Sequence, residues 1–198
     1  MKNIYLSGGG NEQASFSLDR YFFGEIPVGG KLLYIPIALV GHRLYATAPQ
    51  WFTKLVRMHN REDLTITAAK NFADVTDKLL EYDAIYIGGG NTNTLNKRAH
   101  ESGFAEALQD YIKKGRGVVY GGSAGAILLG RYLDTCKEID VINTPGLDLL
   151  NDYSIFCHYE GQDISDWQQH HDGRAITLAE NEGIIFNKQS IVLKTRTN

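Results

Sequence analysis

Short runs of apolar residues alternate along the chain with longer segments in which apolar residues recur every three or four positions. The short runs are rich in Ile, Leu, Val and Tyr, as buried parallel strands require, and the spaced segments are typical of helices that cover a sheet. This alternation predicts an α/β fold with a mostly parallel sheet flanked by helices. The predicted strands of the first part of the chain are Lys2–Leu6, Lys31–Pro36, Leu64–Thr67, Ala84–Ile87 and Gly117–Tyr120.

Two of the predicted helices have recognisable ends. Asp74 is placed to cap a helix over Val75–Tyr82, and Gly115 is placed to end a helix whose apolar face includes Phe104 and Leu108. Beyond residue 123 the pattern is less regular, and we expect several of the strands there to be antiparallel additions at the far end of the sheet. These strands are Tyr153–Cys157, Arg174–Leu178, Gly183–Phe186 and Ile191–Leu193.

Length, composition and charge narrow the function classes. A chain of 198 residues with 43% hydrophobic content can bury one core, so we expect residues 1–198 to form a single domain. The net charge of −3, with acidic and basic residues interspersed, argues against a nucleic-acid partner and against a polybasic membrane anchor. Short peptides or other small molecules are the expected partners.

The cysteines and the first residues bear on the compartment. Met1–Leu6 has the pattern of a short strand rather than of a signal peptide, and the sequence contains no long apolar span, so we expect a cytoplasmic, reduced protein. The two cysteines, Cys136 and Cys157, are then expected to be packed in the interior. A redox pair is the alternative.

The most informative segment is an apolar strand, Val118–Tyr120, that runs through Gly-x-Ser-x-Gly into an apolar helix. This pattern is typical of a nucleophile elbow, in which Gly121 and Gly125 let strand and helix approach while the Ser123 hydroxyl projects from the sheet. The free N–H groups at the start of the helix would then face a developing oxyanion. A turn that merely packs the helix on the strand is the alternative.

Two strand ends have nearly the same glycine-rich turn, at Ser7–Asn11 and Gly88–Thr92. Neither turn has the glycine spacing of a dinucleotide site or the Gly-Lys-Ser/Thr of a phosphate loop, so nucleotide binding is weakly supported. Because loops at the carboxyl ends of neighbouring strands meet at one crevice, N–H groups at Gly89 or Gly90 could face Ser123. The first turn is interpreted as a simple tight turn.

Two motifs together resemble the peptidase E family of aspartyl-dipeptidase-like serine peptidases. They are IYIGGGNTNTL at Ile85–Leu95 and YGGSAGA at Tyr120–Ala126. The resemblance implies a flavodoxin-like fold of the class I glutamine amidotransferase type, with serine in place of cysteine at the elbow. It also implies an oxyanion hole made by the backbone N–H groups of Gly90 and Ala124.

The resemblance further places the catalytic histidine at His158, in the segment Phe156–Tyr159, after a matching segment at Pro145–Leu147. The chemistry favours the same residue, because a nucleophilic serine needs a neighbouring base and His158 follows directly on a predicted apolar strand. A structural role at the strand end is the alternative.

The other histidines are less suited to act as the base. His42 and His59 precede the strand that leads to the elbow, and His100 closes a polar helix. His170 and His171 are adjacent, so their rings point to different sides and a metal site is a poor interpretation. We expect both of them to be exposed to solvent.

A carboxylate must hold the imidazole of such a triad. Leu178–Ile184 resembles the Leu-x-Glu segment of the family, which assigns this role to Glu180. Glu182 lies two residues further and would point to the same face of an extended segment. Glu138 and Asp140 are secondary candidates near the site, and an ordinary surface charge is the alternative for each acid.

Substrate preference is where the sequence departs from the family, whose aspartyl-specific members carry an arginine between the catalytic histidine and the triad acid. The segment Tyr159–Gly173 contains no Lys or Arg. It holds Glu160, Asp163, Asp166 and Asp172. A substrate aspartate would be repelled there unless a cation came from Arg174, Arg131 or Arg43.

These observations predict a serine hydrolase that cleaves short peptides by acyl transfer, with doubtful aspartyl specificity and with no metal or organic cofactor implied. The same residues could hydrolyse a non-peptide ester or amide, and the fold could also serve as an inert binding protein.

Overall fold

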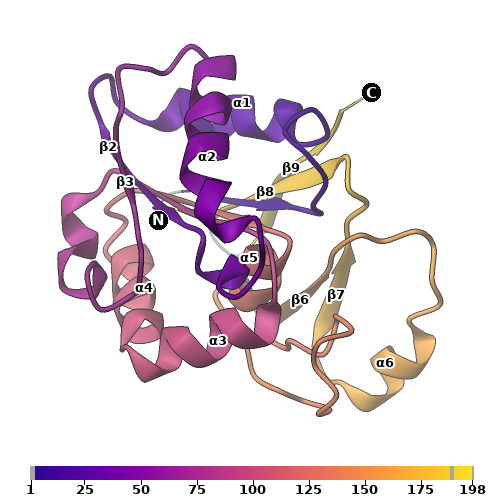
Figure 1. Ribbon diagram of the computed structural model, residues 1–198. Helices are drawn as coiled ribbons and strands as arrows, with labels where there is room; N and C mark the ends of the chain where they lie inside the picture. The colour runs from indigo at the N-terminus through magenta and orange to yellow at the C-terminus, as the bar shows by residue number, and fades with distance from the viewer. Residues whose placement is uncertain (1–2, 188–189, 198) are drawn as a thin grey trace.

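The computed structural model describes residues 3–187 and 190–197. Its central sheet has seven strands in the order β3-β2-β4-β5-β1-β8-β9 (Figure 1). The parallel strands are β1 (Ile4–Ser7), β2 (Lys31–Ile35), β3 (Thr65–Ala68), β4 (Ala84–Ile87) and β5 (Val118–Gly122). At the β1 side, β8 (Glu182–Asn187) and β9 (Ser190–Arg196) add on antiparallel. The predicted fold class is confirmed; of the predicted strand Lys2–Leu6, Lys2 lies outside the described residues.

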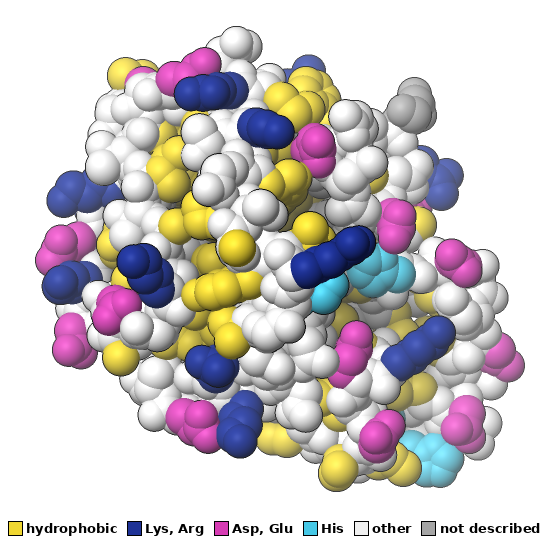
Figure 2. Space-filling view, viewed as in Figure 1, with side chains coloured by type: hydrophobic (Ala, Val, Ile, Leu, Met, Phe, Trp, Pro, Cys, Tyr) yellow, Lys and Arg dark blue, Asp and Glu magenta, His cyan; other side chains and the backbone are white. Residues whose placement is uncertain are grey.

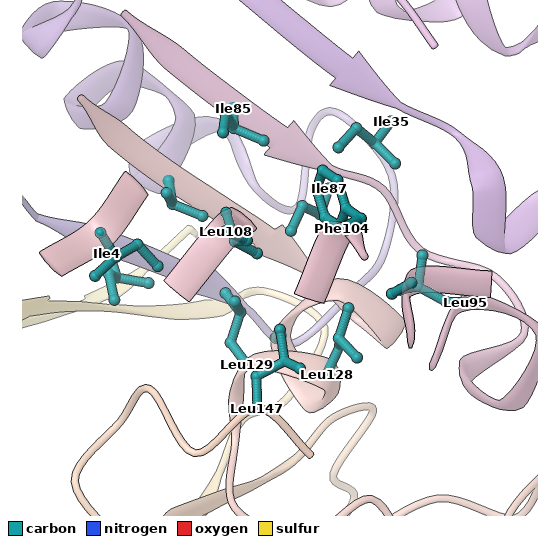
Figure 3. Packing of buried hydrophobic residues seen from close by; sticks show 14 of the residues in the cluster. Ile4, Ile35, Ile85, Ile87, Leu95, Phe104, Leu108, Leu128, Leu129 and Leu147 are labelled. Atoms are coloured by element: carbon teal, nitrogen blue, oxygen red, sulfur yellow. The ribbon is translucent and has the colours of Figure 1, made fainter. Parts of the chain in front are cut away.

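Helices cover both faces of this sheet. The helices α1 (Phe16–Glu25) and α2 (Ala48–Met58) pack on one face, and α3 (Thr92–Glu101), α4 (Phe104–Lys113) and α5 (Ala124–Leu129) pack on the other. Because successive strand residues point to opposite faces, Ile4 and Leu6 join the core below α4, whereas Tyr5 joins the core below α1. Figure 3 shows part of the first core. Burial on both faces explains why these strands are apolar throughout.

Of the four strands expected after residue 123, two, β8 and β9, are the antiparallel additions to the main sheet. The strands β6 (Tyr153–Phe156) and β7 (Arg174–Thr177) do not extend the main sheet; they pair in parallel as a separate two-stranded sheet, and α6 (Ser165–His170) lies in the crossover between them. The helix expected at Val75–Tyr82 is a 3₁₀ helix, η3 (Thr76–Glu81), with no side-chain cap. The side chain of Asn71 accepts a hydrogen bond from Asp74 N–H, so the capped turn lies earlier in the chain.

Other expected features are present. Gly115 follows α4 with φ +60°, a conformation that glycine adopts without strain, and the helix ends there. Two short 3₁₀ helices, η1 (Ile37–Leu39) and η2 (Tyr45–Thr47), connect β2 to α2. Within the described part of the chain, every helix is too short or too polar to cross a membrane.

Candidate active site

Ser123 lies on the turn between β5 and α5, in a strained conformation with φ +47°. The flanking glycines are required by close approaches. A Cβ on Gly121 would lie 2.7 Å from the backbone of Gly125, and a Cβ on Gly125 would lie 3.0 Å from the side chain of Ile87. The N–H of Ser123 donates to the carbonyl of Ser7 on the neighbouring strand, at 3.1 Å. A positive φ at a residue other than glycine is the conformation that the expected nucleophile elbow requires.

The imidazole of His158 bridges Ser123 and Glu180. Its Nε2 lies 2.7 Å from Ser123 Oγ, and its Nδ1 lies 2.9 Å from Glu180 Oε1. The side chains of His158 and Glu180 are 50% and 62% exposed, so both are open to solvent and to a ligand. With the proton on Nδ1 held by the carboxylate, Nε2 is free to accept the hydroxyl proton of the serine.

The first glycine turn forms a platform behind this imidazole. The N–H of His158 donates to the carbonyl of Gly8 at 2.9 Å. Gly9 has φ +122°, and a Cβ there would lie 2.8 Å from both ring nitrogens of His158. A Cβ on Gly10 would lie 3.2 Å from the Cβ of Glu180. The first glycine turn, expected from the sequence to be a simple tight turn, therefore also supports two side chains of the site. Its sequence similarity to the second glycine turn was the signal that could have predicted this role.

The second glycine turn lies beside the serine. A Cβ on Gly89 would lie 3.2 Å from the Cβ of Ser123. Gly90 has φ +136° and passes so close to η1 that a Cβ there would lie 2.6 Å from the Ala38 carbonyl carbon. Ala124 is the first residue of α5. Gly90 belongs to this turn and Ala124 directly follows Ser123, and the role of their backbone N–H groups as an oxyanion hole is a proposal.

The alternative acids occupy other positions. Glu182 accepts a hydrogen bond from Ala179 N–H at 3.1 Å and forms ion pairs with Lys194 and Arg196 at 3.2 and 3.3 Å. Burial acts to raise the pKa of Glu182, but these partners outweigh it and hold the pKa below its usual range. Its carboxylate is therefore engaged away from His158. Glu138 and Asp140 lie in the exposed segment after α5, and Glu138 lines the cavity described below.

The sequence profile of Peptidase family S51 matches residues 4–193. The chain belongs to peptidase family S51. Peptidase E of Actinobacillus pleuropneumoniae serotype 3 (strain JL03) is 28% identical over 205 residues, which cover 97% of this chain and 81% of that protein. Peptidase E of Streptomyces coelicolor is 27% identical over 139 residues, which cover 69% and 54%.

Solved structures support the same fold for this S51 peptidase. The crystal structure of a candidate peptidase E protein from Listeria monocytogenes EGD-e superposes with a TM-score of 0.75 at 21% identity and covers all of both chains. The structure of a peptidase from an acI-B1 actinobacterium gives a TM-score of 0.70 at 15% identity, over 93% of this chain and 83% of that one. The resemblance to peptidase E noted in the sequence is confirmed, and the protein is a hydrolase of the peptidase class.

Ser123 and His158 of the S51 peptidase line a cavity of about 1320 Å³. Figure 2 shows hydrophobic side chains exposed near the middle of this face of the molecule, with positively charged and histidine side chains beside them. Among the residues that the structure describes, the lysines that line the cavity are Lys54 and Lys137, and both lie outside the segment Tyr159–Gly173 in which a cation was sought.

Two of the three arginines considered as substrate ligands are engaged elsewhere. Arg131 binds Asp152 and Asp172, and the guanidinium of Arg174 lies 4.3 Å from the centre of the Tyr153 ring. Arg43 is exposed. None of the three lines the cavity described above.

The expectation that His171 is exposed is wrong. Its side chain is only 2% exposed, stacks on Trp167 at 4.1 Å and places Nε2 at 2.9 Å from Asp134. This contact ties α6 to the segment after α5. His170 is exposed, as expected.

Neither thiol is in a disulfide, and burial raises the pKa of Cys136 to about 11 and that of Cys157 further. Both thiols are therefore protonated, in line with packing rather than redox chemistry. Among the residues with described positions, no group of three or more His, Cys, Asp or Glu side chains could hold a metal ion.

Proposed function

We propose that this S51 peptidase is a serine peptidase that hydrolyses short peptides through an acyl-enzyme. The observation that carries the proposal is the pair of contacts that His158 makes with Ser123 and Glu180, at 2.7 and 2.9 Å, in the lining of a cavity of about 1320 Å³. His158 takes the proton of Ser123, and Oγ attacks the peptide carbonyl. Glu180 holds the imidazole in the required tautomer and stabilises the imidazolium.

The remaining steps follow from the same groups. The N–H groups of Gly90 and Ala124 stabilise the oxyanion of the tetrahedral intermediate. His158 then donates its proton to the leaving amine, which departs as the acyl-enzyme forms. Water then attacks the acyl carbon as it loses a proton to His158, and His158 returns that proton to Ser123 Oγ when the bond between Oγ and the acyl group breaks.

The charges around the cavity support weak selectivity for aspartyl peptides. The acids that line the side formed by the segment after β6 and by the segment after α5 are Asp134, which pairs with His171, and Glu138, Glu160 and Asp163. Against them on that side stands Lys137. The acids on this side outnumber the lysine, and like charges repel each other. An aspartyl side chain of the substrate is therefore expected to gain little binding free energy there.

A fluorophosphonate probe tests the proposal. Folded wild-type protein should gain one covalent adduct at Ser123, found by intact mass and peptide mapping, and should also cleave neutral dipeptides. Ser123→Ala is the matched control and should show neither. Absence of labelling would contradict the proposal in favour of an inert binding protein. Labelling with cleavage of esters but not of peptides would instead indicate an esterase.

A further inference from the structure

The cavity has two sides that differ in chemistry. One side is formed by η2, α2 and the ends of β2 and β4, and the other by α6 and the segments after α5 and β6. In Figure 1 the helices α2 and α6 lie on opposite sides of α5, which begins next to Ser123. The nucleophile thus lies between the two sides, so a bound peptide can extend toward both. We call the first of them the α2 lobe; its apolar lining residues are Tyr34, Leu39, Leu44, Ala48, Trp51 and Tyr86.

The apolar wall of the α2 lobe is uncovered in part: Tyr34, Ala48 and Tyr86 are buried, and Thr47, Gln50 and Lys54 also line the lobe. The side chain of Leu44 is 50% exposed, and that of Trp51 is half-buried. The Tyr34 ring lies 6.3 Å from Trp51 and 5.9 Å from Tyr86, so the aromatic side chains are close neighbours. An uncovered apolar surface inside a concave site gains free energy when an apolar group displaces its water.

The indole of Trp51 is held in place before any substrate arrives. Its Nε1 donates to the carboxylate of Glu12 at 3.0 Å, and Glu12 lies on the segment that follows the first glycine turn. This hydrogen bond, with a contribution from Lys54, lowers the pKa of Glu12, so the carboxylate is ionised and its charge is balanced within the lobe. A fixed wall costs little conformational entropy when a ligand binds.

The size of the cavity also matters. Its volume of about 1320 Å³ exceeds the range of about 300 to 1,000 Å³ that holds a drug-sized ligand, so there is room for side chains on both sides of the scissile bond. We propose that the α2 lobe is a specificity subsite that receives a bulky apolar side chain of the peptide, aromatic or branched aliphatic. This inference rests on the proposed peptidase function and names the substrate class of the same site.

The test compares two series of dipeptides, X-Ala and Ala-X, with X as Ala, Leu, Phe or Glu. In wild type, Leu and Phe should exceed Ala in kcat/KM by about ten- to a hundredfold in one of the two series, since a hydrophobic pocket discriminates by this amount. Trp51→Ala should abolish that preference in the same series, so that kcat/KM for Leu and Phe falls to about the value for Ala. Trp51→Phe, which keeps an aromatic wall, should retain most of it.

Two further variants keep the test decisive if Trp51→Ala does not fold. Leu44→Glu places a charge at a position that is already exposed, and it should lower kcat/KM for Leu and Phe by a larger factor than for Ala. Val28→Glu, at a side chain that is 91% exposed and does not line the cavity, is the control and should change nothing. Equal rates for all X in wild type, or equal losses for all X in Leu44→Glu, would overturn the inference. Failure of wild type to react with the fluorophosphonate would instead overturn the peptidase mechanism on which it rests.

Discussion

Replacing Gly9 with alanine should disable the site while the protein stays folded. Gly9 has φ +122°, and the new Cβ would lie 2.8 Å from both ring nitrogens of His158. An ordinary contact begins near 3.4 Å, and the ring carbon between the two nitrogens is closer still, so the imidazole must move by roughly 1 Å. The movement would break the contact of 2.7 Å with Ser123 Oγ, because the backbone of His158 is bound to Gly8 and cannot follow.

The expected loss can be estimated from this displacement. A misplacement of about 1 Å in a reacting group costs on the order of a hundredfold in rate, and complete loss of the base costs up to about a million-fold. The turnover of Gly9→Ala should therefore fall by at least about a hundredfold. Backbone strain at this φ adds a destabilisation of about 1 to 3 kcal/mol, which lowers the melting temperature by only several degrees in a chain of this size.

The assay is the rate of fluorophosphonate labelling, measured beside thermal unfolding on the same preparation. Gly29→Ala is the matched control, because Gly29 also has a positive φ, +71°, but a Cβ there meets no atom within 4 Å. This control should lose stability and keep the wild-type labelling rate. A Gly9→Ala protein that is folded and is labelled as fast as wild type would refute the platform argument.

Three further predictions concern the triad, the substrate and one buried acid. Ser123→Ala and His158→Ala should each reduce kcat by about a million-fold, with little further loss in the double variant. Glu180→Gln should reduce kcat by roughly ten-thousand-fold, and a fully active Glu180→Gln protein would exclude Glu180 as the third member of the triad. Ala-Leu and Lys-Leu should match or exceed Asp-Leu in kcat/KM, and a strong lead for Asp-Leu would show that a cavity lysine binds the aspartate. Burial raises the pKa of Asp19 to about 7 from its ordinary 3.8, so the folded state holds a proton that the unfolded chain releases. The free energy of unfolding should therefore fall as the pH rises from about 4 to 7, by at most on the order of 4 kcal/mol, and urea titrations of Asp19→Asn should lack this fall.

The parallel sheet could be predicted because each of its strands is buried on both faces and so forms an apolar run. The apolar run of a strand does not determine which other strand it pairs with. Nothing local to Tyr153–Phe156 distinguishes a strand that joins the main sheet from one that pairs with Arg174–Thr177 in a separate sheet, since both need the same apolar residues.

Burial of a polar residue depends on partners that are distant in sequence. His171 was expected to be exposed because its neighbours in the chain are polar. It is buried because Asp134, 37 residues earlier, accepts a hydrogen bond from one ring nitrogen, while the Trp167 ring covers the imidazole. An imidazole whose ring nitrogens are hydrogen-bonded can be buried at little cost in free energy. The polar residues that flank it in the sequence nevertheless predict an exposed position.

The choice between Glu180 and Glu182 shows how far local geometry can be inferred. Two residues apart in an extended segment, both side chains would point to the same face, and either could reach His158. The segment is instead a turn, closed by the hydrogen bond from Glu182 N–H to the Ala179 carbonyl at 2.9 Å, so the two carboxylates diverge. Glu180 faces the imidazole across the first glycine turn, and Glu182 begins β8 and pairs with cations on β9. If this turn is what assigns the roles, Glu182→Gln should lower stability but leave the labelling rate of Ser123 near wild type, and a loss of labelling comparable to that of Glu180→Gln would contradict the assignment.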